Sequence, residues 1–157
     1  MFAASTNKGI CMLAFYNEKT IQKQIDKLKK FFDADIMSAH NIHFDTLKKE
    51  LDEYFEGKRE NFEVPLQLLG TPFQISVWKI LQAIPYGNTI SYQEQANLIN
   101  NPKAVRAVAS ANANNLIGIV IPCHRVIGKN GKLTGYAGGI DKKEFLLNLE
   151  KNNMCQH

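Results

Sequence analysis

The sequence predicts an α/β (α+β) fold of two lobes, and three observations on the 157-residue chain support that prediction. Two short apolar runs on either side of Thr6-Asn7-Lys8-Gly9 indicate a β-hairpin. Apolar residues at helical spacing follow in several later segments. An extended connection at 58–70 then separates an acidic half from a basic half. We therefore expect an N-terminal lobe over 1–69, a hairpin or small sheet with helices, and a mostly helical C-terminal lobe over 70–157.

The N-terminal lobe is expected to contain the hairpin over 2–16 and two amphipathic helices. Asn and Gly in the hairpin turn tolerate positive φ. Apolar residues recur at helical spacing in 21–32 and again in 44–55, so each segment is predicted to be a helix with one buried face. The connection at 58–70 contains Pro65 and is expected to be extended.

A further helix is expected at the start of the C-terminal lobe. Thr71 is a suitable N-cap, and Pro72 suits the first turn because its missing N–H has no helical partner there in any case. Apolar residues then continue along one face up to Pro85-Tyr86-Gly87. Proline and glycine together are expected to end the helix at that point.

Two short helices across a tight turn are predicted after it. Ser91 and Glu94 have the spacing of a capping box and start the first of them. Asn101 and Pro102 repeat the pattern of cap and proline, so the second helix is predicted to run from 103 to about 112. Such a pair indicates a helix-turn-helix, although the small residues of the second helix are equally typical of a helix that only packs.

The net charge of +4 is concentrated in the C-terminal half. Residues 70–157 contain 9 Lys and Arg against 4 Asp and Glu, whereas residues 1–69 contain 10 against 11. A basic block of this kind suits an anionic partner such as nucleic acid, because each cation that replaces a phosphate counterion adds affinity. Charge alone leaves the question open, since many basic domains bind nothing anionic.

The longest apolar run, 116–122, is far shorter than the roughly 18 residues of a membrane span. No charged and then apolar leader opens the chain, so a soluble, intracellular protein is expected. Three cysteines, Cys11, Cys123 and Cys155, form no CxxC pair, so neither a disulfide framework nor a thiolate zinc site is expected. His40 and His43 add no set of four metal ligands at a plausible spacing.

Cys123 is the candidate nucleophile. It lies within Pro122-Cys123-His124-Arg125, which interrupts a β-branched apolar stretch at 117–127 that is predicted to be a strand. A free cysteine in such a stretch is usually an inert core residue. Here the neighbouring polar side chains would need partners in the interior, which a merely structural strand would avoid. A nearby histidine and arginine are also expected to lower the pKa of the thiol from about 8.5.

The PCHRVIG motif at 122–128 resembles the active-site motif of the O6-alkylguanine-DNA alkyltransferases, also called methylated-DNA–protein-cysteine methyltransferases. Four further segments are similar to that family in the same order, and the resemblance covers nearly the whole C-terminal lobe. The N-terminal lobe resembles the family only in its pattern of hairpin and helices. The four segments are GTPFQISVW at 70–78, IPYGNTISY at 84–92, NPKAVRAVASAN at 101–112 and TGYAGG at 134–139.

The resemblance implies roles for individual residues. Cys123 would attack the alkyl carbon on O6 of guanine in one displacement step. His124 would take the thiol proton through a bound water, and Glu150, in a helix from Asp141, would hold the imidazole. Cys123 would lie in an active-site loop of the C-terminal lobe, and Asn115 would brace the turn of that loop. Tyr92 would crowd the 3′ phosphate and supply the proton that guanine needs as it leaves.

The resemblance also implies that the base is flipped out of the duplex. Arg106 would then fill the place of the extruded nucleotide, with the second helix of the helix-turn-helix in the minor groove. Residues expected to contact DNA are Arg106, Tyr92, Ala107, Ser110 and Arg125. The guanine pocket is expected to consist of Cys123, Val126, Tyr136 and Ala137, with Gly118 and Ala137 on its rim.

The protein is therefore expected to repair O6-alkylguanine, and O4-alkylthymine as well, in double-stranded DNA. Because water does not displace a thioether at neutral pH, Cys123 would react once and irreversibly. We expect no cofactor, no metal, no membrane association, a monomer, and a place in the cytoplasm of a bacterium or archaeon or the nucleus of a eukaryote.

Three alternatives compete with this interpretation, and each needs a feature that this sequence lacks. A non-catalytic sensor of alkyl lesions would have another residue in place of Cys123. A Cys-His hydrolase would need its histidine on a different element and an oxyanion hole. A helix-turn-helix regulator would need more side chains that reach base edges.

Overall fold

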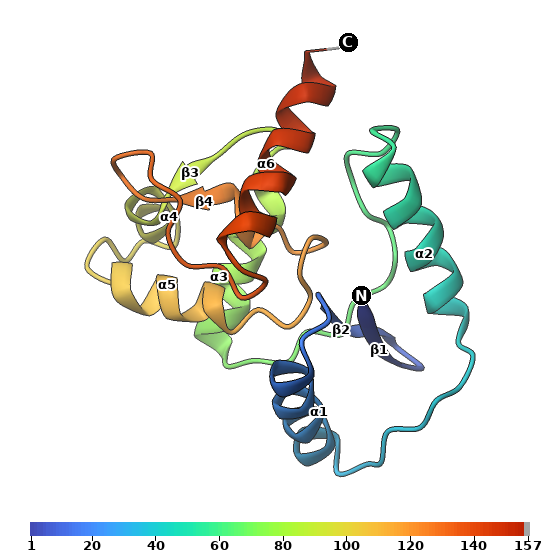
Figure 1. The fold of residues 1–157 in the computed structure, drawn as a ribbon. Helices are drawn as coiled ribbons and strands as arrows, with labels where there is room; N and C mark the ends of the chain where they lie inside the picture. The colour runs from blue at the N-terminus through green and yellow to red at the C-terminus, as the bar shows by residue number, and fades with distance from the viewer. Residues whose placement is uncertain (156–157) are drawn as a thin grey trace.

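The N-terminal hairpin consists of β1 (Phe2–Thr6) and β2 (Gly9–Ala14), which pair in antiparallel fashion. The structure is a computed structural model that describes residues 1–155, and Figure 1 shows the hairpin between α1 and α2. All of β2 except Ala14 is buried, whereas β1 buries only Ala4. Gly9 has φ +151°, and a Cβ on it would overlap the Pro65 carbonyl, so this position requires glycine.

The second edge of β2 pairs with two distant segments. At its start, the Ile10 N–H donates to the Pro65 carbonyl at 2.8 Å, and the Gln67 N–H donates to the Ile10 carbonyl at 2.8 Å. At its end, Leu13 forms the same kind of pair with 116–118, since its N–H donates to Leu116 and its carbonyl accepts from Gly118, both at 2.8 Å. The hairpin is thus bonded directly to the segment that leads into the Cys123 turn.

Both helices predicted for the N-terminal lobe are confirmed. The first, α1 (Glu18–Phe32), is capped by the Asn17 side chain, and α2 (Ile42–Phe55) is capped by Asn41. Each asparagine accepts a hydrogen bond from an N–H of the first turn that has no helical partner. At its C-terminus α1 ends on Asp33, which has φ +47°.

Glu50, buried on α2, fixes the connection between the lobes. Its carboxylate accepts hydrogen bonds from the backbone N–H groups of Glu63 and Val64 at 3.1 Å. The Arg59 guanidinium lies 3.6 Å away and balances part of the charge. The connection contains neither helix nor strand and bends at 60, 61 and 64, and this carboxylate holds it against α2.

In the C-terminal lobe, α3 (Pro72–Ala83) begins with the predicted Thr71 cap and also forms a full capping box with Gln74. Trp78 on α3 donates through Nε1 to the Ala111 carbonyl at 2.8 Å, which fixes the packing of α3 on α5. The last helix, α6 (Ile140–Met154), runs along the lobe to the C-terminus (Figure 1). Within residues 1–155, no helix has the length and apolar character needed to cross a membrane.

The two short helices are α4 (Tyr92–Leu98) and α5 (Val105–Ala113). The capping box predicted at the start of α4 is confirmed. The predicted start of α5 at 103 is wrong, because Asn101 and Pro102 belong to the turn between the helices. There the Asn101 carbonyl accepts from the Ala104 N–H, and α5 begins after it without a side-chain cap.

The strand predicted over 117–127 is also wrong. Successive tight turns occupy 117–122, with Ile119 at φ +68°, and lead into a 3₁₀ turn, η1 (Cys123–Arg125). Only β4 (Val126–Ile127) is extended, and it pairs in parallel with β3 (Ile90–Ser91). The segment is apolar because it is a buried turn between the two lobes, and an apolar run by itself does not distinguish such a turn from a strand.

Replacing Glu50 by glutamine should weaken the attachment of the connection to α2. An amide can offer only one acceptor oxygen where the carboxylate uses both, so we expect a loss of about 1–3 kcal/mol in the free energy of unfolding. Urea denaturation measures this loss. Glu56→Gln, at the exposed C-cap of the same helix, is the control and should change stability by less than about 0.5 kcal/mol. Equal effects of the two variants would contradict the role of Glu50.

Candidate active site

The side chain of Asn115 holds the Cys123 turn in place. Its Nδ2 donates to the Ile121 carbonyl at 2.8 Å and to Cys123 Sγ at 3.3 Å, and its Oδ1 accepts from the Ile117 N–H at 3.0 Å. Cys123 itself is only 7 % exposed. The structure therefore brings Asn115 and Cys123 together, and one amide contacts both the backbone of the turn and its sulfur.

Glu150 lies at the centre of a buried polar cluster. Oε1 of its carboxylate is 2.7 Å from Nε2 of His124 and accepts from Tyr54 at 2.7 Å, while Oε2 accepts from the Gly87 N–H at 3.0 Å. Arg125 adds Nε and Nη2, both at 3.0 Å. Burial alone would raise the pKa of Glu150, but the hydrogen bonds and charges of His124 and Arg125 outweigh it and lower the pKa to about 2.

The tautomer of His124 follows from this contact. An ionised carboxylate only accepts hydrogen bonds, so Nε2 carries the proton and Nδ1 is left with a lone pair. Within the described chain Nδ1 has no hydrogen-bond partner. Burial lowers the pKa of His124, although Glu150 acts in the opposite direction, so the imidazole is neutral at pH 7. His124 is thus an oriented base with a free acceptor.

The expectation that the pKa of Cys123 is lowered is wrong for this structure. Burial raises the pKa of the thiol, and the Asn115 hydrogen bond and the positive charge of Lys143 offset only part of that effect. The thiol is therefore protonated at neutral pH. The nearby arginine does not stabilise a thiolate, because its guanidinium is bound to Glu150.

Lys143 is a residue at the site that sequence reasoning missed. It is fully buried, and its Nζ donates to the carbonyls of Val126 at 2.6 Å, Thr134 at 3.0 Å and Gly135 at 3.3 Å. A signal was present in the sequence, because Lys143 lies seven residues before Glu150 and hence on the same face of α6. The ammonium group ties the segment after η1 to the 134–135 loop beside Cys123.

Two cavities meet at Cys123. One, of about 510 Å³, is lined by Tyr92, Arg106, Tyr136 and Ala137 as well as the cysteine. The other, of about 310 Å³, reaches Cys123 from the side of α1 and includes Gly118, with Tyr136 and Ala137 shared between the two. Most of the residues expected at the guanine pocket and its rim therefore lie around one sulfur atom.

Val126 and Arg125 are not where the sequence reasoning placed them. Val126 lines neither cavity, and its carbonyl already accepts from Lys143. Arg125 is 5 % exposed, and its Nη1 donates to the Ile84 carbonyl at 2.7 Å. Its assignment to the DNA surface is wrong, because its donors are directed to Glu150 and Ile84 in the interior.

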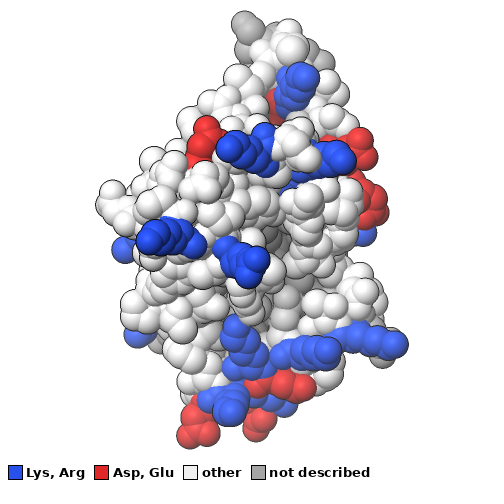
Figure 2. Space-filling view, turned by 90° about the vertical axis from the view of Figure 1, so that its left-hand side faces the viewer, with Lys and Arg blue, Asp and Glu red and all other residues white. Residues whose placement is uncertain are grey.

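The exposed face of α5 carries Arg106, Ala107 and Ser110. Its opposite face is buried against the lobe, so these side chains are free to contact another molecule. Figure 2 shows this side of the molecule, where Lys and Arg atoms lie across the middle and Asp and Glu atoms are confined to the upper and lower parts. The surface around α5 is thus suited to an anionic partner.

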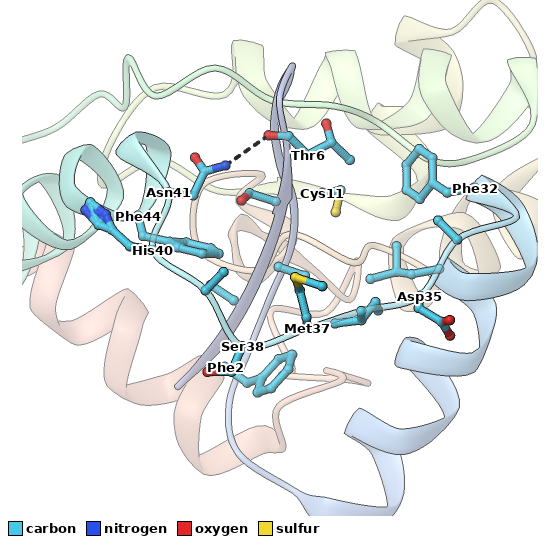
Figure 3. A pocket seen from close by; sticks show the side chains of 17 residues that line it. Phe2, Thr6, Cys11, Phe32, Asp35, Met37, Ser38, His40, Asn41 and Phe44 are labelled. Atoms are coloured by element: carbon cyan, nitrogen blue, oxygen red, sulfur yellow. Dashed lines mark hydrogen bonds between the residues drawn. The ribbon is translucent and has the colours of Figure 1, made fainter.

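A third hollow, of about 590 Å³, lies in the N-terminal lobe, away from Cys123. It runs between β1 and the segment 34–41, and its lining is largely apolar, with Phe32, Met37 and Phe44 among the side chains in Figure 3. Nearby, His40 pairs with Asp45 at 2.9 Å. Across residues 1–155, no three His, Cys, Asp or Glu side chains gather as a metal site would require.

These features define a two-lobed protein with a helix-turn-helix and a buried cysteine next to an oriented histidine–glutamate pair. The sequence profile described as "6-O-methylguanine DNA methyltransferase, ribonuclease-like domain" matches residues 3–68, and the one described as "6-O-methylguanine DNA methyltransferase, DNA binding domain" matches residues 72–152. The chain belongs to the 6-O-methylguanine DNA methyltransferase family.

Individual relatives agree with this assignment. The chain is 46% identical over 150 residues to the inducible methylated-DNA–protein-cysteine methyltransferase of Bacillus subtilis, which covers 96% of this chain and 83% of that protein. It is 58% identical over 111 residues to the enzyme of Methanosarcina mazei, covering 71% and 70%. Among solved structures, Mycobacterium tuberculosis OGT in complex with DNA matches with a TM-score of 0.75, at 39% identity, covering 96% of this chain and 86% of that one. The family, the fold class and the enzyme class predicted from the sequence are confirmed.

Replacing Lys143 by methionine should make Cys123 harder to deprotonate. The variant keeps the length of the side chain but removes the positive charge that lowers the pKa of the thiol. The pH at which iodoacetamide modifies Cys123, followed by peptide mass spectrometry, should therefore move upward. Stability should also fall by about 1–3 kcal/mol, because three carbonyls lose their donor. Lys151→Met, exposed on the same helix, is the control, and a matching shift in it would refute the charge effect.

Proposed function

We propose that this protein repairs O6-alkylguanine, and O4-alkylthymine, in double-stranded DNA by flipping the damaged base and transferring its alkyl group to Cys123. The observation that carries the proposal is the position of Cys123 at the meeting of two cavities, next to Asn115 and preceding His124, which is bonded to Glu150. The names of the relatives support it, as does the similarity to the solved structure of Mycobacterium tuberculosis OGT in complex with DNA. Cys123, His124, Glu150, Asn115 and Tyr92 are the residues proposed to perform the chemistry.

The proton of the thiol moves first toward His124. Its Nδ1, the free acceptor, takes the proton through a bridging water, and the negative charge of Glu150 stabilises the imidazolium that forms. Because the thiol is protonated and the imidazole neutral at pH 7, this transfer belongs to the reaction itself. Sulfur then forms its bond to the alkyl carbon as the bond from that carbon to O6 breaks.

Tyr92 completes the proton balance. Burial raises the pKa of its phenol, so the group is a proton donor at neutral pH, and its hydroxyl donates to the Thr134 carbonyl at 3.0 Å. When the guanine lies in the cavity, the phenol supplies a proton to the departing base and is restored by the proton taken from the thiol. The products are an S-alkylcysteine and an unmodified guanine, and no cofactor enters the balance.

The exposed face of α5 is the proposed contact with DNA. Arg106 lines the larger cavity at Cys123 and is exposed, which supports the proposal that its side chain fills the gap that a flipped nucleotide leaves. Ala107 and Ser110 beside it are small enough to let the helix approach the minor groove closely. Little sequence can be distinguished there, which suits a protein that must inspect every guanine.

We propose two domains with their boundary at 69–70, supported by family profiles that match 3–68 and 72–152. The reaction needs one copy of the chain and access to DNA. A monomer in the bacterial or archaeal cytoplasm is therefore the proposed working state, as the bacterial and archaeal sources of the relatives support. The presence of Cys123 and its oriented base favours transfer over a lesion sensor without chemistry.

Incubation with a duplex carrying one O6-methylguanine should add one methyl group per chain. Intact mass should rise by a single CH₂ unit, and peptide mapping should place it on Cys123, since Cys11 and Cys155 line neither of the two cavities that meet at Cys123. Cys123→Ser should abolish the transfer, because a hydroxyl is a far weaker nucleophile, while lesion binding remains. Turnover beyond one equivalent, or methylation of another cysteine, would refute the proposed reaction.

Replacing Arg106 by alanine should separate flipping from chemistry. Repair of the duplex lesion should slow by about tenfold or more, because the flipped state loses the side chain that replaces the base. Reaction with free O6-benzylguanine should change by less than about twofold, since a free base needs no extrusion. Single-turnover rates on both substrates give the comparison, with Lys103→Ala as a control for general loss of charge. An equal loss on both substrates would assign Arg106 to the fold.

A further inference from the structure

A side chain from the N-terminal lobe reaches the centre of the catalytic cluster. Tyr54 lies on α2, 96 residues before Glu150, and its hydroxyl donates to Glu150 Oε1 at 2.7 Å. The same oxygen is 2.7 Å from Nε2 of His124, and all three side chains are completely buried. Tyr54 and His124 thus share one acceptor atom.

The Tyr54 hydroxyl is a fixed donor. Its ring packs among Phe55, Phe62 and Tyr86, with centroids 5.4, 5.4 and 5.9 Å away. Burial, and then the negative charge of Glu150, raise the pKa of the phenol well above its usual value of about 10. The group therefore stays protonated over the pH range of the reaction, and its direction is set by packing.

We infer that Tyr54 is a positioning residue for the alkyl transfer, which orients Glu150 toward His124 and limits how much of the carboxylate charge acts on the imidazole. This inference rests on the proposed function. A donor to Oε1 draws part of its negative charge, so less is available to stabilise the imidazolium. The contact also prevents rotation of the carboxylate. The N-terminal lobe would in this way contribute to a reaction performed in the C-terminal lobe.

Without the Tyr54 hydroxyl, more of the Glu150 charge faces His124 and the pKa of the imidazole rises. Below that pKa His124 already holds a proton and cannot take the one from Cys123. The acidic limb of the rate profile should therefore move to higher pH. The titratable groups that face this cluster are Glu150 and Lys143 from α6, Cys123 and Arg125 from η1, Tyr54 from α2, and Tyr86 and Tyr136.

The test compares Tyr54→Phe with wild type and with Tyr86→Phe. Tyr54→Phe keeps the packed ring and removes one hydroxyl. Tyr86→Phe removes a hydroxyl from the same aromatic cluster, but that hydroxyl accepts from Asn153 and does not contact Glu150. Single-turnover methyl transfer from the O6-methylguanine duplex is measured between about pH 5 and 9. In parallel, NMR follows the titration of the His124 imidazole, a readout that does not depend on activity.

For Tyr54→Phe we expect the rate near pH 5.5, relative to its own plateau, to be about threefold lower than in wild type. The His124 titration should move to higher pH with it, and both should be unchanged in Tyr86→Phe. Superimposable rate profiles of wild type and Tyr54→Phe would overturn the inference. Equal shifts in the two variants, or a Tyr54→Phe protein that fails to fold, would also overturn it, because either result would assign Tyr54 to packing. If wild type transfers no methyl group, the proposed function fails, and that result is distinct from all of these.

Discussion

Burying a carboxylate completely costs several kcal/mol of folding free energy unless hydrogen-bond donors surround it, and the carboxylate of Glu150 is completely buried. Its two oxygens are matched by groups from three separate parts of the chain: α2, the turn at Gly87 and η1. Each of these parts must lie close to α6 for the charge to be tolerated. The need to surround the Glu150 carboxylate with donors therefore also determines where the cysteine turn lies. Loss of any one donor would leave part of the charge unmatched.

The hairpin sets the position of the cysteine turn from the other side. The β2 strand is a continuous apolar strip whose free edge bonds first to the connection between the lobes and then to 116–118. Asn115, directly before that segment, then holds the Cys123 turn by donating hydrogen bonds to the Ile121 carbonyl and to the sulfur of Cys123. Helix α2 connects the same parts, because Glu50 holds the connection and Tyr54, one turn later on the same face, contacts Glu150. The site is therefore built by both lobes, although Cys123 and His124 belong to one.

Local signals in the sequence predicted most of the helices and the hairpin, because caps, turn residues and periodicity act between near neighbours in the chain. The same signals failed where contacts between residues far apart in the chain determine the local structure. Asn101 and Pro102 have the pattern of a helix start, yet the turn uses them to join α4 to α5. An apolar run at 117–127 is a buried turn, and Arg125 is directed to the interior by a carboxylate 25 residues away. Lys143 was missed because lysine side chains are almost never fully buried, so this one was assigned to solvent. Only a comparison of its position with that of Glu150, on the same face of α6, indicates that it is buried.

Burial of Cys123 also keeps its thiol protonated. In the proposed reaction each molecule reacts once, so this protonation bears on how the cysteine avoids other reactions before it meets a lesion. A sulfur with a lowered pKa would be a thiolate at neutral pH and would react with any electrophile that entered the cavity. Burial holds Cys123 as a thiol, and the neutral His124 keeps an acceptor ready without removing the proton in advance. Reactivity then depends on a base that fills the cavity, brings its alkyl carbon to the sulfur and accepts a proton as it leaves. In the proposed reaction, selectivity for the lesion comes from withholding the thiolate until those groups are assembled.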